Sequence, residues 1–76
     1  MAKTQTTLII HLEKADAVES IKKVLEKVPQ GRSKIYLILK TKDYNVEFEL
    51  PQHYTLTPDV LDNLSQIMGI SEIKQA

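Results

Sequence analysis

The apolar residues of this chain switch between two kinds of spacing, and the order of the switches limits the fold. Short β-branched or alternating apolar runs, typical of strands, occupy residues 8–12, 35–39, 45–50 and 70–73. Residues 16–28 and 58–68 instead repeat their apolar positions every three or four residues, as an amphipathic helix does. The order β-α-β-β-α-β predicts an α+β, ferredoxin-like domain, with a four-stranded antiparallel sheet and two helices on one face.

Polar residues at the expected helix ends support this order. Asp16 with Glu19 three residues later resembles a capping box, which predicts the start of the first helix. Gly31 is predicted to lie at the end of that helix. Thr57 is expected to cap the second helix, because a proline follows it, and Gly69 is expected to end that helix.

Length and composition indicate one small domain. We interpret residues 1–6 as a flexible N-terminus or an addition to the natural chain, and residues 7–76 as a single ferredoxin-like domain. Ten basic residues balance ten acidic ones, whereas a free-standing nucleic-acid binder normally has a basic excess. The chain has no cysteine, no apolar leader and no apolar run long enough for a bilayer. We therefore expect a cytoplasmic protein without membrane or direct nucleic-acid contacts.

The sequence predicts no catalytic residue, no cofactor-binding residue and no metal site. There is no cysteine nucleophile, and neither His11 nor His53 has a catalytic motif around it. Glu47 and Glu49 share one face of a strand, but no third ligand follows at a recognisable spacing. No glycine-rich phosphate loop is present. We therefore expect this domain not to be an enzyme.

The helix-free face of the predicted sheet is the candidate contact surface. Two residues from each of the first two strands should point outward there, and one tyrosine without a nearby arginine is a poor platform for nucleic-acid bases. An apolar patch rimmed by Lys40, Glu47 and Glu49 suits a protein partner better, although a small tolerated patch is the alternative reading. Together with the loop before the second helix, the candidate partner-binding residues are Ile9, His11, Tyr36, Ile38 and Tyr54.

Several segments in series carry a resemblance to a known family. They are "LEKVPQG", "KIYLILKT" and "VEFELPQHYTLTPDVLDNLSQIMGISEIK". The chain from Thr7 to Lys74 resembles the C-terminal domain of the bacterial DNA polymerase III alpha subunit, the replicative polymerase. Tyr54, Leu56 and Pro58 match the family's aromatic and "l-p" positions before a leucine-rich helix.

The resemblance implies a docking role rather than catalysis. The parent chain would be a DNA-directed DNA polymerase, a nucleotidyltransferase, with its active site upstream of this domain. In the family this domain contacts the tau subunit of the clamp loader and so joins the polymerase to other replisome proteins in DNA replication. The alternative is a free-standing regulatory domain of the same topology that binds a small molecule. Such domains usually carry a glycine-bearing loop after the first strand, and "HLEKADAVES" (residues 11–20) contains no glycine.

Overall fold

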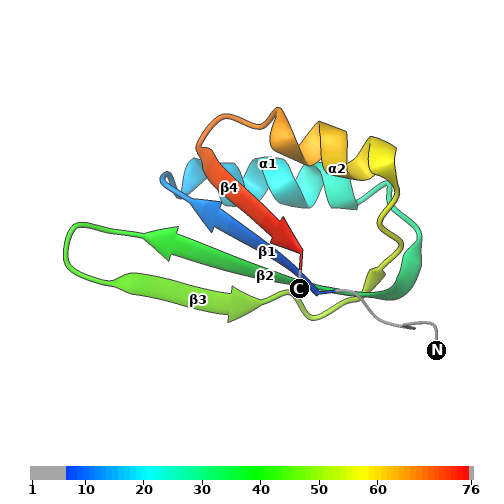
Figure 1. The fold of residues 1–76 in the computed structure, drawn as a ribbon, viewed down its shortest axis with the longest axis horizontal. Coiled ribbons are helices and arrows are strands. Elements are labelled where there is room, and N and C mark those ends of the chain that lie inside the picture. Colours follow the sequence, from blue (N-terminus) through cyan, green and yellow to red (C-terminus); the bar gives the residue numbers. More distant parts are fainter. Residues whose placement is uncertain (1–6, 76) are drawn as a thin grey trace.

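A computed structural model of the chain describes residues 7–75 (Figure 1). The prediction for residues 1–6 lies outside this part of the chain. The elements follow in the predicted order: β1 (Thr7–Leu12), α1 (Asp16–Leu25), β2 (Gln30–Lys40), β3 (Asn45–Glu49), α2 (Pro58–Ser65) and β4 (Ile70–Gln75). The fold is therefore α+β, with two helices and a four-stranded sheet.

The sheet is mixed, so the prediction of a wholly antiparallel sheet is wrong. The strand order is β3-β2-β1-β4, and β1 pairs directly with β2 in parallel. The pairs β2–β3 and β1–β4 are antiparallel. The parallel pair arises because α1 carries the chain back along the sheet, so that β2 runs in the same direction as β1 and lies beside it.

Both helices cover one face of the sheet (Figure 1). In β1 every second residue is fully buried. The register places Leu8 and Ile10 beside the fully buried Ile35 and Leu37 of β2, and Leu12 beside the partly buried Leu39. Because side chains alternate between the faces of a strand, one face of β1 and β2 forms the floor of the core. The helices close this core from above. Its fully buried large side chains are Leu8, Ile10, Leu12, Ile21, Ile35, Leu37 and Leu64.

The two helix starts differ in how far the sequence predicted them. The Thr57 hydroxyl accepts a hydrogen bond from the Val60 backbone N–H (3.3 Å), so the predicted cap of α2 is confirmed. The prediction of a capping box at Asp16 is wrong. Ala15 already has helical backbone angles and its carbonyl accepts from the Val18 N–H (3.0 Å), so Asp16 lies inside the first turn. Its carboxylate can favour the positive end of the helix dipole there, but it makes no cap hydrogen bond.

Gly31 lies within β2 rather than at the end of α1, and a close backbone approach explains why it is glycine. Its N–H donates to the His53 carbonyl (3.2 Å), while the Thr55 N–H donates to the Pro29 carbonyl (2.9 Å). A β-carbon at Gly31 would lie 2.6 Å from the Thr55 backbone nitrogen, closer than real contacts allow. The missing side chain therefore lets the chain before α2 lie against the start of β2.

Replacement of Leu64 tests the core. We expect Leu64→Ala to lower the free energy of unfolding by about 2–5 kcal/mol, because it leaves a cavity under α2. The matched control is Met68→Ala. Met68 is 86% exposed, so its truncation should change stability by no more than about 0.5 kcal/mol. Urea denaturation followed by circular dichroism measures both. Equal effects for the two variants would contradict the core described above.

Replacement of Gly31 tests the backbone contact. We expect Gly31→Ala to destabilise the domain, because the new β-carbon would push residues 54–55 away from β2. The loss should exceed about 1 kcal/mol, since a steric clash outweighs the gain of about 0.4–1 kcal/mol that this substitution gives at unstrained sites. A variant that is as stable as the wild type, or more stable, would show that the two segments do not lie this close.

Candidate protein-docking face

The sheet face opposite the helices brings together four of the predicted site residues. Ile9 and His11 of β1 and Tyr36 and Ile38 of β2 are all half-buried, whereas the residues between them are fully buried on the other face. The parallel register sets Ile9 beside Tyr36 and His11 beside Ile38. We call this two-by-two group of Ile9, His11, Tyr36 and Ile38 the open-face patch.

Charged side chains border the open-face patch along both outer strands. On β3, Glu49 lies beside Tyr36 and Glu47 beside Ile38. On β4, Lys74 lies beside Ile9 and Glu72 beside His11.

Two rows therefore cross the sheet, each with a charged residue at both ends and two patch residues in the middle. The sequence predicts Glu47 and Glu49 at the rim but does not predict Glu72 and Lys74. The position of these two residues depends on β4 lying beside β1 and on a register shift between His11 and Leu12, neither of which the sequence pattern shows.

The β4 border has its own internal contacts. The Lys74 ammonium lies 3.8 Å from a Glu72 carboxylate oxygen, and both side chains are 56% exposed. An ion pair this exposed contributes little to stability, so both groups can be redirected to a partner at small cost. The Ser71 hydroxyl donates to the His11 carbonyl (3.2 Å) at the register shift and holds this part of β4 against β1.

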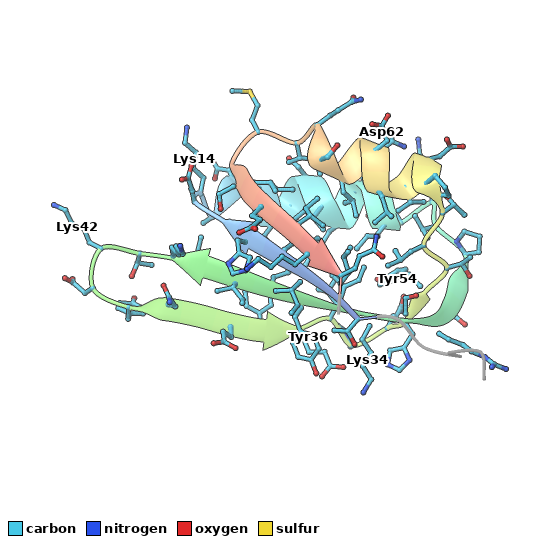
Figure 2. The ribbon with its side chains drawn as sticks, in the orientation of Figure 1. Lys14, Lys34, Tyr36, Lys42, Tyr54 and Asp62 are labelled. Carbon is cyan, nitrogen blue, oxygen red and sulfur yellow. The ribbon has the colours of Figure 1, made fainter. Side chains whose placement is uncertain are left out.

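Tyr54 lies apart from the open-face patch. It bridges to Gln30 and Ser33 at the start of β2, and its side chain packs against the buried core. Figure 2 shows Tyr36 projecting from the sheet away from the helices, whereas Tyr54 lies beside the chain that leads into α2. One flat partner surface therefore cannot cover the open-face patch and Tyr54 together.

Tyr54 instead helps to form a groove that the sequence did not predict. The groove has a volume of about 590 Å³ and runs between the end of α1 and the chain after β3, where Leu25, Val28 and Leu50 supply apolar surface. Lys22 and Glu26 stand at its α1 side. The two segments that line the groove, residues 22–30 and 50–54, are far apart in the sequence, so no local pattern indicated it.

The described residues show no arrangement for catalysis by a metal. Within residues 7–75, no three His, Asp or Glu side chains lie close enough together to hold a metal ion. His11 stands between Ile38 and Glu72 on the open face, and His53 lies in the connection after β3, where its backbone carbonyl accepts a hydrogen bond from Gly31. Over the same residues, neither helix is long and apolar enough to cross a membrane.

Comparisons with known proteins give no relative. No protein-family model matches the chain, and no match emerges among curated proteins or solved structures. The resemblance to the polymerase family therefore stays a prediction.

Two neighbouring side chains of β2 test which face is open. We expect Tyr36→Ala to lower the free energy of unfolding by about 1 kcal/mol or less, because it removes only cross-strand contacts on the open face. Leu37→Ala should lower it by about 2–5 kcal/mol, because Leu37 is fully buried under the helices. Denaturant titrations compare the two variants. A larger loss for Tyr36→Ala than for Leu37→Ala would mean that the two faces are reversed.

Proposed function

We propose that this chain is a non-catalytic docking domain from the C-terminus of a bacterial DNA polymerase III alpha subunit. It would link the polymerase to the tau subunit of the clamp loader during DNA replication, in the cytoplasm. The resemblance from Thr7 to Lys74 supports the family, and so does the β-α-β-β-α-β order of the elements. We include in the proposal that the fold is related to the ferredoxin-like fold. The parent chain would be a DNA-directed DNA polymerase, and this domain would carry none of its active site.

The observation that carries the docking role is the open-face patch. Both central strands contribute apolar side chains to a face that neither helix covers. A partner that covers Ile9, Tyr36 and Ile38 gains by removing their exposed surface from water. The charged borders on β3 and β4 then orient the partner and reject a partner of the wrong charge. An apolar centre with a polar rim is the usual organisation of a protein–protein interface.

Tyr36 is the expected centre of binding. Tyrosine is enriched among the few residues that dominate binding energy, and Tyr36 lies in the middle of its row, between Ile9 and Glu49. Its hydroxyl can form a hydrogen bond at the rim while its ring packs on the partner. We therefore expect binding to depend on Tyr36 more than on any border charge.

Measured affinity for purified tau tests this proposal. We expect Tyr36→Ala to weaken binding about thirtyfold or more, which corresponds to about 2 kcal/mol for a hot-spot residue. The matched control is Tyr44→Ala, a tyrosine in the β2–β3 turn that is 64% exposed and outside the patch. This variant should bind like the wild type. Isothermal titration calorimetry gives both values. Absence of wild-type binding would overturn the tau assignment, and equal weakening by the two variants would overturn the open-face patch.

An immunoblot tests the parent chain separately. An antibody against this domain should detect a very large polypeptide in extracts of the source cells. A band near 8.7 kDa would instead show a free-standing protein and would remove the polymerase assignment.

A second candidate is a small-molecule-binding regulatory domain, which the groove beside Tyr54 favours. Its volume is within the usual range for ligand pockets, and Leu25, Val28 and Tyr54 give it apolar walls. Such a domain would show ligand-dependent protection of these residues and no dependence on Tyr36. The two candidates are thus separated by which of the two surfaces responds to substitution.

A further inference from the structure

The outer edge of β3 is a strand edge without a partner among the described residues. β3 is the last strand on its side of the sheet, pairs only with β2, and has a regular register without a shift. Figure 1 shows the β2–β3 hairpin extending beyond the two helices. An edge of this kind has backbone N–H and C=O groups that can bind another strand.

Two backbone hydrogen bonds determine which backbone groups of β3 point away from β2. The Leu50 N–H donates to the Ile35 carbonyl (3.0 Å), and the Thr41 N–H donates to the Tyr44 carbonyl (2.9 Å). In an antiparallel ladder, hydrogen-bonded pairs alternate with pairs that do not bond. Because the bonded pairs at the two ends of β3 contain Leu50 and Tyr44, the pairs of Val46 and Phe48 also bond to β2. The backbone groups of Asn45, Glu47 and Glu49 therefore point away from β2, toward the free edge.

The side chains of β3 give this edge a chemical preference. Glu47 and Glu49 lie on the open face, beside Ile38 and Tyr36. Val46 and Phe48 lie on the opposite face, where Val46 is 36% exposed. An added strand would therefore place every second side chain beside two carboxylates and the alternate ones beside apolar groups.

A second copy of this chain does not fit the edge. The antiparallel register that pairs all five residues of β3 with a second β3 sets Glu47 opposite Glu47 and Asn45 opposite Glu49. Like charges directly opposite each other destabilise a strand pair. The same carboxylates attract a strand whose alternate residues are lysine or arginine, so charge complementarity selects the partner.

We propose that the β3 edge binds an extended protein segment of alternating basic and aliphatic residues, which adds to the sheet as a fifth, antiparallel strand. Basic side chains of the segment lie opposite Glu47 and Glu49, and an aliphatic side chain between them packs against Phe48. Main-chain hydrogen bonds to β3 provide affinity, and the two carboxylates provide specificity, as in other cases of strand addition. This second surface adjoins the open-face patch at Glu47 and Glu49 but uses the backbone edge of β3 instead of the four patch residues, and it does not rest on the polymerase assignment.

A synthetic peptide tests the proposal directly. The probe is acetyl-Thr-Lys-Val-Lys-Ile-Thr-amide, whose lysines match the spacing of Glu49 and Glu47 in an antiparallel register. Amide hydrogen exchange of the whole chain is followed by NMR. At about ten times the Kd, exchange at Glu47 and Glu49 should slow about tenfold, because mass action leaves only about a tenth of the edges free. The amides of Val46 and Phe48 should change little, because they already bond to β2.

Matched peptides separate strand addition from simple charge attraction. A peptide with glutamate in place of both lysines should not bind. A peptide whose two lysines are methylated on the backbone amide nitrogen should also lose binding, because it keeps its side-chain charge but lacks the N–H donors that pair with β3. The variant Glu47→Lys/Glu49→Lys should reverse the preference and bind the glutamate peptide. Protection by the N-methylated peptide, an unchanged preference in the double variant, or no slowing at Glu47 and Glu49 with the probe would each overturn the proposal.

Protein variants separate this surface from the open-face patch. Glu47→Pro removes an outward N–H without removing a bond to β2, and should abolish peptide binding, whereas Glu47→Gln should retain it in weakened form. Tyr36→Ala should bind the peptide like the wild type even though its binding to tau is weakened. Loss of peptide binding in Tyr36→Ala would show that the peptide occupies the open face, which overturns the β3 assignment and leaves the docking proposal standing.

Discussion

The direct parallel pairing of β1 with β2 is the interaction on which the rest of the structure depends. It aligns two apolar strands so that the fully buried Leu8 and Ile10 of β1 lie beside the fully buried Ile35 and Leu37 of β2 under the helices. The same register aligns the intervening residues on the opposite face. A shift of one residue in either strand would move its buried side chains to the open face, so the core and the patch cannot vary independently. Burial under α1 and α2 therefore determines indirectly which residues form the open-face patch.

The sequence predicted the parts of this fold that depend on local spacing. The alternation in residues 45–50 predicted β3 and its two faces, and Thr57 with Pro58 predicted the start of α2. It failed where distant segments meet and at one local backbone conformation. The strand order depends on which strand lies beside β1, Gly31 is explained only by the approach of Thr55, and Asp16 matched a capping pattern that the backbone at Ala15 does not permit. Each of these features requires a contact or a dihedral angle that residue spacing does not encode.

The candidate site was likewise predicted only where it depends on local spacing. Two-residue alternation was enough to put Ile9, His11, Tyr36 and Ile38 on one face. Only the register could show that they form neighbouring pairs and that Glu72 and Lys74 border them. Tyr54 was grouped with them because it precedes α2 in a polar connection, but its side chain packs against the core at the start of β2. The open face and the β3 edge share Glu47 and Glu49, so a partner on one surface alters the electrostatic field at the other.

The long strand β2 also has a mechanical consequence. It spans 11 residues, and its burial falls from its middle toward the β2–β3 turn. Ile35 and Leu37 are fully buried, whereas Lys40 is exposed and the following turn is held by a few local hydrogen bonds, including those between Thr41 and Tyr44. Resistance to opening depends on buried contacts, so the free energy of local opening should fall along β2 toward the turn. The β2–β3 turn can then bend to follow a partner, while Ile35 and Leu37 keep their places in the core.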